Sequence, residues 1–469
     1  MTAHPVASLK NREKPTPTPL PSAFPGAEWY DDEEIQAATR VLRNRSPFRY
    51  YGPKWEGEVA GLEREFARFL SSRPGEPWPE KTDLFVTAVN SGTGALEVAL
   101  DAMGVGEGDE VLVQGFMWIS SISAIVRNRA IPVLVDSDDT LNMDPASIRS
   151  RVTPRTRVIM PVPMMGGCAR IGAIMEEVRA INADREKQGL PPILVLEDCA
   201  QVMGAHATGA PGSRVPLGSP GIHRVGTFGD AAIFSLQINK NITAGEGGLV
   251  VTRDPALARL IEALHNTGFA RDEAQPKTWY GDSPVGWGHG RRMTELQGAI
   301  ARVQLKRLDS IILRMRESHG RIESFIRSLG LVPRSRADAS NPGDTGYYCL
   351  FSIPVQGRSH DEQVRYGRAV ADALAPFGLN PWFMHDFEVH VYYNIQSLVE
   401  KWPVHKAGPW DASAAATSLQ VYDRGTLPRL DALLTSTIGI NVPSRLSEAD
   451  ENYIRRVLAY VNDNVIQQS

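Results

Sequence analysis

Short apolar runs alternate with segments of helical period through the first half of this chain. The runs occupy residues 83–88, 110–113, 131–135, 158–162, 193–197, 231–236 and 249–252. Buried strands separated by helices are typical of a mainly parallel sheet that carries helices on both faces. We therefore predict an α/β fold built on a mainly parallel, seven-stranded sheet.

Segments with helical periodicity precede and follow the predicted strands in the sequence. The acidic residues 31–34 suit the positive end of a helix dipole, and a second amphipathic helix is expected over about 56–70. Between these two helices lies an aromatic loop at 47–53. A long helix is expected from Thr294 toward Leu329, with a break near residues 318–320.

The remaining segments set the predicted domain boundaries. We expect a disordered or surface-draped tail over 1–27, N-terminal helices with a large domain over 28–310, and a connecting helix with a small α/β domain over 311–469. In the last part the pattern indicates a strand at 347–354 and helices at 361–376 and 447–465. Two polar insertions, 182–190 and 207–225, interrupt the large domain, and the second is expected to be a long surface loop.

Composition excludes several classes of protein. A chain of 469 residues with 42% hydrophobic and 22% charged residues is expected to be a soluble protein of two domains. A net charge of −4 favours neither nucleic acid nor an anionic membrane as partner. Three scattered cysteines predict neither a disulfide framework nor a metal site. We expect a cytoplasmic protein, since the chain shows no secretory signal and no apolar run of about 18 residues.

Lys240 lies in the most informative segment of the chain. An apolar strand precedes it, and the glycine-rich stretch 245–248 leads from it into a second strand. A lysine at the end of a buried strand loses hydration, which is costly unless the amine is used. An amine in a dry pocket can form a Schiff base with a carbonyl. A surface lysine beside a hairpin is the alternative, and the flanking serine and glycines favour the covalent role.

Three other segments offer what a Schiff-base cofactor needs. Residues 90–96 follow a strand and open a helix, whose free amides can bind phosphate, although Ser91 can equally serve as a simple helix cap. Asp198 ends an apolar strand, where it can pair with a protonated ring nitrogen or cap the next helix. Trp118, also just after a strand, can stack on an aromatic ring or belong to the core.

Taken together and in order, these segments resemble the fold type I enzymes that use pyridoxal 5′-phosphate (PLP). More closely, they resemble the DegT/DnrJ/EryC1/StrS family of sugar aminotransferases. The family's marks are a Ser-Gly-Thr-x-Ala-Leu turn, Glu-Asp-x-Ala-Gln, Gly-x-x-Gly-Asp and Ser-x-x-x-x-Lys followed by Gly-Glu-Gly-Gly. In this chain they stand at 91–96, 197–201, 226–230 and 235–248.

The resemblance assigns a role to each site residue. It implies that Lys240 forms the internal aldimine and shuttles a proton, and that Asp198 binds the pyridinium nitrogen. Gln201 would lie against the phenolic side of the ring, and Trp118 would stack on its face. The phosphate would be held by Gly92, Thr93 and Ser235.

Two departures from the family pattern concern the substrate and the neighbouring subunit. The family has Gly-x-Asn-x-Arg-Met before the long helix, but Gly290 stands at the Asn position here, so that Arg291 or His289 would have to make its phosphate contact. The family's strand-end histidine is Pro163. Gln237, two residues after Ser235, is similar to the branches that act on cyclitol ketones or octulosonate-type keto sugars.

The expected function is a ping-pong amino transfer from L-glutamate or L-glutamine to a keto or aldehyde sugar or a cyclitol ketone, in aminosugar, aminocyclitol or other natural-product biosynthesis. The alternatives are a PLP-dependent keto-sugar dehydratase, which carries histidine in place of Lys240, and a non-catalytic PLP-binding regulatory protein. By resemblance we expect a homodimer with shared active sites. Residues 48–53 and 288–292 are candidates to line the neighbouring site, and His385, His390 and Tyr392 are candidates to meet the substrate.

Overall fold

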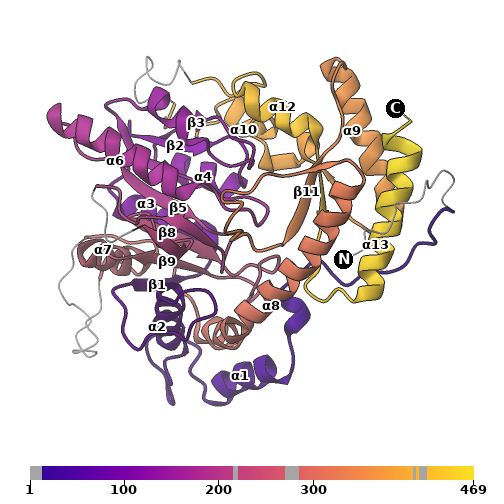
Figure 1. Cartoon of the computed structure of the whole chain (residues 1–469). Coiled ribbons are helices and arrows are strands. Elements are labelled where there is room, and N and C mark those ends of the chain that lie inside the picture. The colour runs from indigo at the N-terminus through magenta and orange to yellow at the C-terminus, as the bar shows by residue number, and fades with distance from the viewer. Residues whose placement is uncertain (1–12, 215–219, 270–284, 405–407, 411–419, 469) are drawn as a thin grey trace.

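Seven strands form one twisted sheet at the centre of the protein (Figure 1), as the apolar runs predict. The structure is a computed structural model that describes residues 13–214, 220–269, 285–404, 408–410 and 420–468. The strands are β1 (Phe85–Val89), β2 (Glu110–Gln114), β3 (Ile131–Val135), β4 (Thr156–Met160), β5 (Leu194–Asp198), β8 (Ala231–Ser235) and β9 (Gly248–Thr252). Their order is β1-β9-β8-β5-β4-β2-β3, and β9 alone runs antiparallel to its neighbours in this sheet.

Helices cover both faces of this sheet because alternate strand residues point to opposite sides. Val111 and Val113 of β2 belong to the core on one face, and Leu112 between them belongs to the core on the other. The first face carries α3 (Gly92–Ala102), α4 (Ile119–Arg127) and α7 (Pro255–His265). The second carries α2 (Glu58–Ser71), α6 (Ile171–Lys187) and the first turns of α8 (Glu295–Ser328).

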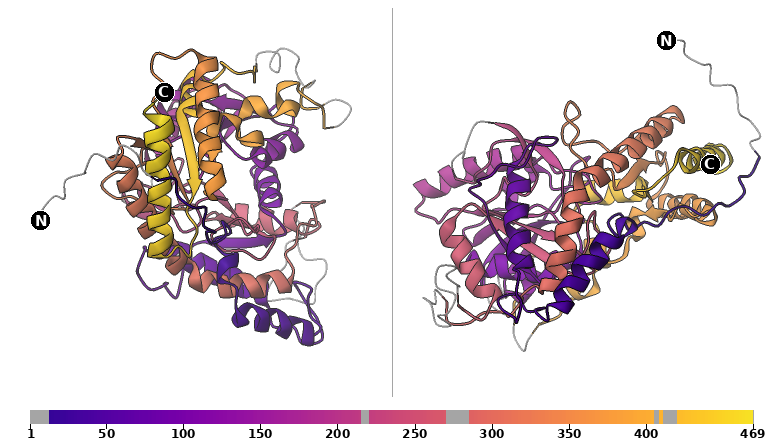
Figure 2. Two further views of the ribbon diagram at one scale, coloured as in Figure 1. Left: turned by 90° about the vertical axis from the view of Figure 1, so that its right-hand side faces the viewer. Right: turned by 90° about the horizontal axis from the view of Figure 1, so that it is seen from below.

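The long helix α8 runs from the large sheet to the C-terminal region (Figures 1 and 2). Thr294 caps it in a reciprocal capping box with Gln297. The helix is continuous over all 34 residues, so the break expected near 318–320 is absent. A glycine inside a helix costs only about 1 kcal/mol relative to alanine, and the apolar stripe on either side of Gly320 outweighs it.

A second sheet, with the order β10-β11-β13-β12, lies beyond α8. Its strands are β10 (Val332–Pro333), β11 (Tyr348–Ser352), β12 (Trp382–Phe383) and β13 (Thr437–Asn441). The helices α9 (His360–Leu374) and α13 (Glu448–Val461) pack on it around a separate hydrophobic core. The domain boundaries expected at residues 28 and 310 stay predictions.

The N-terminal segment and several short elements complete the described chain. The amide of Thr18 donates to the Tyr453 hydroxyl at 3.1 Å, and Leu20 packs on the C-terminal core. Residues 1–12 of the expected tail lie outside the described residues. The other elements are α1 (Asp32–Arg43), α5 (Pro145–Ile148), α10 (Gln396–Val399), α12 (Pro428–Ser436), 3-10 turns at Ala27–Trp29, Arg149–Arg151, Ala375–Phe377, Met384–Asp386, Glu388–His390 and Tyr392–Asn394, and a π turn at Asn462–Ile466.

Both predicted insertions have more regular structure than their composition indicates. Residues 182–187 form the last turns of α6, because Asn182 and Arg185 are buried and hydrogen-bonded there rather than solvated. In the second insertion, β6 (His206–Gly209) and β7 (Gly221–Arg224) pair as an antiparallel hairpin, so the expectation of a plain surface loop was wrong. Residues 215–219 of that insertion are outside the described part of the chain.

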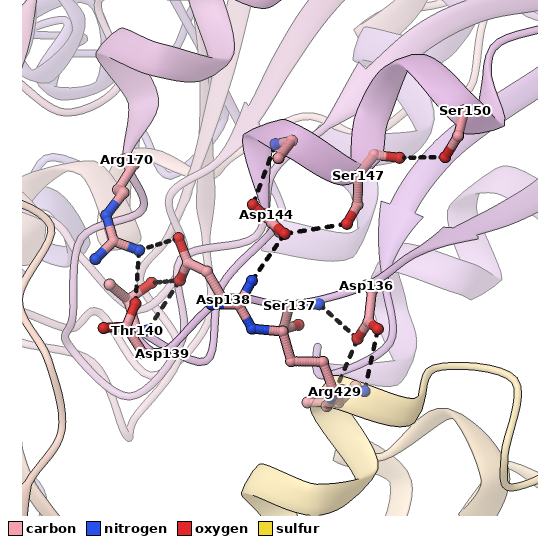
Figure 3. A network of polar contacts seen from close by, with 12 residues as sticks. Asp136, Ser137, Asp138, Asp139, Thr140, Asp144, Ser147, Ser150, Arg170 and Arg429 are labelled. Atoms are coloured by element: carbon pink, nitrogen blue, oxygen red, sulfur yellow. Dashed lines mark hydrogen bonds and ion pairs between the residues drawn. The ribbon is translucent and has the colours of Figure 1, made fainter.

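A network of carboxylates joins the end of β3 to α12 (Figure 3). Asp136, directly after β3, accepts hydrogen bonds from the amides of Arg429 and Leu430 at 3.1 and 2.9 Å. These amides belong to the first turn of α12, where a carboxylate satisfies unpaired N–H groups and complements the helix dipole. The Arg429 guanidinium adds an ion pair to Asp144 at 3.0 Å. This network therefore ties the C-terminal region to the large sheet.

The packing of α8 on the large sheet gives the first prediction. Leu308 is fully buried, whereas Leu313 on the same helix is 58% exposed. Leu308→Ala should lower the free energy of unfolding by about 3 kcal/mol because it leaves a cavity in the core. The measurement is the urea midpoint followed by circular dichroism. Leu313→Ala is the matched control and should change stability by less than about 0.5 kcal/mol, so equal effects of the two variants would contradict the packing described here.

Candidate active site

The predicted phosphate cradle lies where the start of α3 meets the end of β8. Ser91 caps α3, with its hydroxyl accepting from the Gly94 amide at 3.0 Å. A Cβ placed on Gly92 would lie only 2.9 Å from the Cβ of Ser235, so glycine is required for this close approach. The Thr93 hydroxyl is 2.8 Å from that of Ser120. Three residues predicted to hold phosphate thus come from two neighbouring segments at a helix N-terminus, which suits an anion.

Asp198 is a buried carboxylate at the carboxyl end of β5. Its Oδ2 accepts from the Ser121 hydroxyl at 2.8 Å, and its Oδ1 accepts from the Ala200 amide at 3.3 Å. Burial raises the pKa of Asp198, and these two hydrogen bonds and Lys240 oppose that rise. The two donors to Asp198 among the described residues, the Ser121 hydroxyl and the Ala200 amide, are both neutral. The charge of the carboxylate is therefore available to a cationic ring nitrogen.

Lys240 follows β8 in a tight turn rather than ending the strand itself. Its amide donates to the Gln237 carbonyl at 2.9 Å, and its carbonyl accepts from the Gly26 amide at 3.2 Å. Burial lowers the pKa of the Lys240 amine to about 8, although Asp198 and Glu246 act in the opposite direction. A larger fraction of this amine is therefore neutral near pH 7 than for a solvated lysine, as a nucleophilic amine requires.

Trp118 and Gln201 lie on loops that follow β2 and β5, two strands that are separated in the sheet by β4. Trp118 precedes α4 and is 42% exposed, and its ring centroid lies 4.7 Å from that of His390. The Oε1 atom of Gln201 accepts from the Met165 amide at 2.7 Å. Burial, with a contribution from Lys240, lowers the pKa of His390 to about 4, so this imidazole is neutral near pH 7.

Other candidates have different surroundings. Arg291 forms an ion pair with Glu97, and His289 lies 2.9 Å from Asp101, so both side chains next to Gly290 face carboxylates of α3 in their own chain. Tyr392 is fully buried, with its hydroxyl on Asp431, and therefore presents no surface to a substrate.

One remaining candidate, His385, and one residue that the sequence did not single out, Ser121, complete the comparison. His385 pairs with Asp386 at 2.8 Å. Sequence reasoning missed Ser121, because a serine inside an amphipathic helix carries no motif, and only the fold brings it to Asp198.

Neither a bilayer-crossing helix nor a metal cluster is found in the described part of the chain. None of its helices is both long and apolar enough to span a membrane. The same residues contain no group of three or more histidine, cysteine, aspartate or glutamate side chains placed to hold a metal ion. The three cysteines are buried and unpaired by disulfides.

The strand order, the cradle and the lysine–aspartate pair define a fold type I enzyme dependent on PLP. The comparisons identify its family. A model of the DegT/DnrJ/EryC1/StrS aminotransferase family matches residues 28–401, and the chain belongs to this family. It is therefore an aminotransferase that uses PLP as cofactor.

Curated relatives and a solved structure agree with this assignment. The chain is 32% identical over 367 residues to an L-glutamine:2-deoxy-scyllo-inosose aminotransferase of Streptomyces kanamyceticus, covering 75% of this chain and 77% of that protein. It is 34% identical over 360 residues to a 3-amino-5-hydroxybenzoate synthase of Amycolatopsis mediterranei, covering 76% and 80%. A crystal structure of 3-amino-5-hydroxybenzoic acid synthase superposes with a TM-score of 0.70 at 27% identity, covering 97% of this chain and all of that one.

The lowered pKa of Lys240 gives the second prediction. Capture of PLP by the cofactor-free protein should rise with pH through a midpoint near 8, because only the neutral amine attacks. The carboxylate of Asp198 raises the pKa of Lys240, so Asp198→Asn should move the midpoint to lower pH. The measurement is borohydride trapping of PLP on Lys240 at a series of pH values, quantified by mass spectrometry, with Lys240→Ala as the blank. A midpoint near that of free lysine, or one unaffected by Asp198→Asn, would contradict the stated electrostatics.

Proposed function

We propose that this enzyme transfers an amino group to the ketone of a polyhydroxylated ring, either a cyclitol or a keto sugar, with L-glutamine or L-glutamate as donor. The observation that carries the proposal is the pairing of a buried carboxylate, Asp198, with an amine of lowered pKa, Lys240, beside a phosphate cradle. The substrate class is supported by relatives that are named as aminotransferases of 2-deoxy-scyllo-inosose and as a GDP-perosamine synthase.

Each side chain has a distinct role in this proposal. PLP supplies an electrophilic carbonyl and a ring that accepts electron density. The Asp198 carboxylate holds positive charge at the ring nitrogen, and the Ser121 hydroxyl orients that carboxylate. The Nζ atom of Lys240 would hold the cofactor through its carbonyl and would move a proton between a carbon atom of the substrate and a carbon atom of the cofactor. Trp118 would stack on the ring face, and the neutral His390 ring lies beside it at 4.7 Å between centroids.

Glutamine is the first donor to test, because the relatives that act on 2-deoxy-scyllo-inosose carry L-glutamine in their names as the amino donor. Gln237, at a position that distinguishes branches of the family, supports a cyclitol or related keto-sugar acceptor. Its Oε1 accepts from the Asn239 amide at 2.8 Å and so stabilises the turn that carries Lys240.

The donor reaction gives the third prediction. The PLP-loaded protein should lose its visible absorption when L-glutamine is added, and a cyclitol ketone or keto sugar should restore it. Lys240→Ala should show neither change, whereas Lys306→Ala, an exposed lysine on α8, should behave as wild type. Stopped-flow absorbance with L-glutamine and L-glutamate in turn measures the preference. A visible band that persists with both donors would instead favour a PLP-binding protein without transaminase activity.

We also propose a homodimer in which each subunit completes the site of the other. Trp287 is 90% exposed, and Ile35 and Leu42 present exposed apolar surface on one face of α1. Arg292 lies over the Phe48 ring at 5.8 Å and bonds to Asn266, so it joins the two segments that resemblance assigns to the neighbouring site.

Subunit mixing gives the fourth prediction. Arg292→Ala and Lys240→Ala should each be inactive alone, and mixing the two proteins should restore activity, since one site of each mixed dimer is intact. Sedimentation equilibrium should give twice the 51.4 kDa chain mass. A monomer at micromolar concentration, or no recovery on mixing despite dimers, would rule out shared sites.

A further inference from the structure

A strained loop supports the Gln201 side chain. The loop, residues 163–167, follows β4 and contains the proline that replaces the family's strand-end histidine. Its Met165 has φ = 56°, and the following Gly166 has φ = 74°. A non-glycine residue in the left-handed region costs about 1 kcal/mol and persists only where its surroundings fix it. The amide of this same Met165 donates to Gln201.

Arg334, from the C-terminal region, fixes the conformation of this loop. It follows β10, and its guanidinium donates to the carbonyls of Met164 and Met165 at 2.9 and 3.3 Å. A Cβ on Gly167 would lie 2.1 Å from the guanidinium, so a side chain at this position would displace the arginine from the two carbonyls. The planar fork of arginine can hold two adjacent carbonyl oxygens at once, which an ammonium group cannot do in the same way.

Placing the Arg334 guanidinium at this position costs free energy, which indicates a role beyond packing. Burial lowers the pKa of Arg334, and Asp344 opposes that change. No carboxylate of the described residues forms an ion pair with its guanidinium. Removing a cation from water costs free energy, which Asp344 and the two carbonyl hydrogen bonds offset only in part. The guanidinium fixes the orientation of the Met164 and Met165 carbonyls, which lie on either side of the Met165 amide.

We propose that Arg334 is a positioning residue for the cofactor site, which acts through the Met164–Met165 peptide on Gln201. The contacts run from the guanidinium to the Met165 backbone and from the Met165 amide to Gln201 Oε1. This inference rests on the proposed place of Gln201 beside the phenolic side of the PLP ring. Arg334 touches neither cofactor nor substrate in this proposal.

The test compares four variants in PLP-loaded protein. These are Arg334→Met, Arg334→Lys, Gln201→Leu and the double variant with Arg334→Met and Gln201→Leu. Arg185→Met is the matched control, because Arg185 is a buried arginine that, like Arg334, donates only to backbone carbonyls, here those of Pro191, Thr153, Pro154 and Thr156. The measurements are the pH midpoint of the visible absorption of bound PLP, the Kd for PLP, and the thermal midpoint of the cofactor-free protein.

The expected result is the fifth prediction. Gln201→Leu and Arg334→Met should shift the pH midpoint in the same direction, and Arg334→Met should weaken PLP binding about tenfold. The double variant should shift the midpoint no further than Gln201→Leu alone, because both changes remove one interaction. Arg334→Lys should give a smaller shift and carries the test if Arg334→Met does not fold. Arg185→Met should lower the thermal midpoint but leave the pH midpoint and the Kd unchanged.

Three patterns of results would overturn the inference, and they lead to two distinct conclusions. If both Arg334 variants keep the wild-type pH midpoint and Kd while Gln201→Leu changes them, Arg334 is only structural and the role of Gln201 stands. The same conclusion follows if the shifts of Arg334→Met and Gln201→Leu add in full. If Gln201→Leu itself changes neither quantity, the proposed place of Gln201 fails, and the Arg334 inference fails with it.

Discussion

Burial of two ionisable groups at the carboxyl ends of adjacent parallel strands is the constraint on which this site depends. Asp198 ends β5, and Lys240 follows β8, its parallel neighbour. Burial alone would favour the neutral form of each, and their mutual attraction partly opposes this. In the proposed assignment a bound PLP would relieve this conflict, because it would offer a cationic nitrogen to the acid and a carbonyl to the amine.

The C-terminal region contributes to the site although most site residues lie on the large sheet. The His390 carbonyl accepts from the Met117 amide at 2.9 Å, next to Trp118. The Tyr347 hydroxyl donates to the Asn239 carbonyl, next to Lys240. Arg334 holds the backbone beside Gln201. The backbone next to Trp118, Lys240 and Gln201 is thus held by residues of the C-terminal region. The packing of the second sheet therefore affects the geometry of the cofactor site.

Much of the fold followed from local pattern. Each of the seven apolar runs forms a strand of the large sheet. A short run that is apolar on both faces suits a strand that helices cover on both sides. The errors arose where polar residues are buried by distant partners. Asn182 extends α6 because it bonds to the Ile193 backbone, and Arg224 lies in a hairpin because it pairs with Asp309 of α8. Neither partner belongs to the insertion itself, so the composition of the insertion predicted solvent exposure instead.

The sequence by itself determined the chemistry of this protein. The motifs that contain Ser91, Asp198, Ser235 and Lys240 resemble those of a PLP-dependent family, and this resemblance predicted a PLP site, at an edge of the sheet to which parallel strands bring such residues. Only the tertiary structure decided how that site is supported. Ser121 on Asp198, Gly26 on the Lys240 carbonyl and Arg334 behind Gln201 are contacts between segments remote in sequence. Their side chains carry no local signal, since each gains its role from the neighbour that folding brings to it.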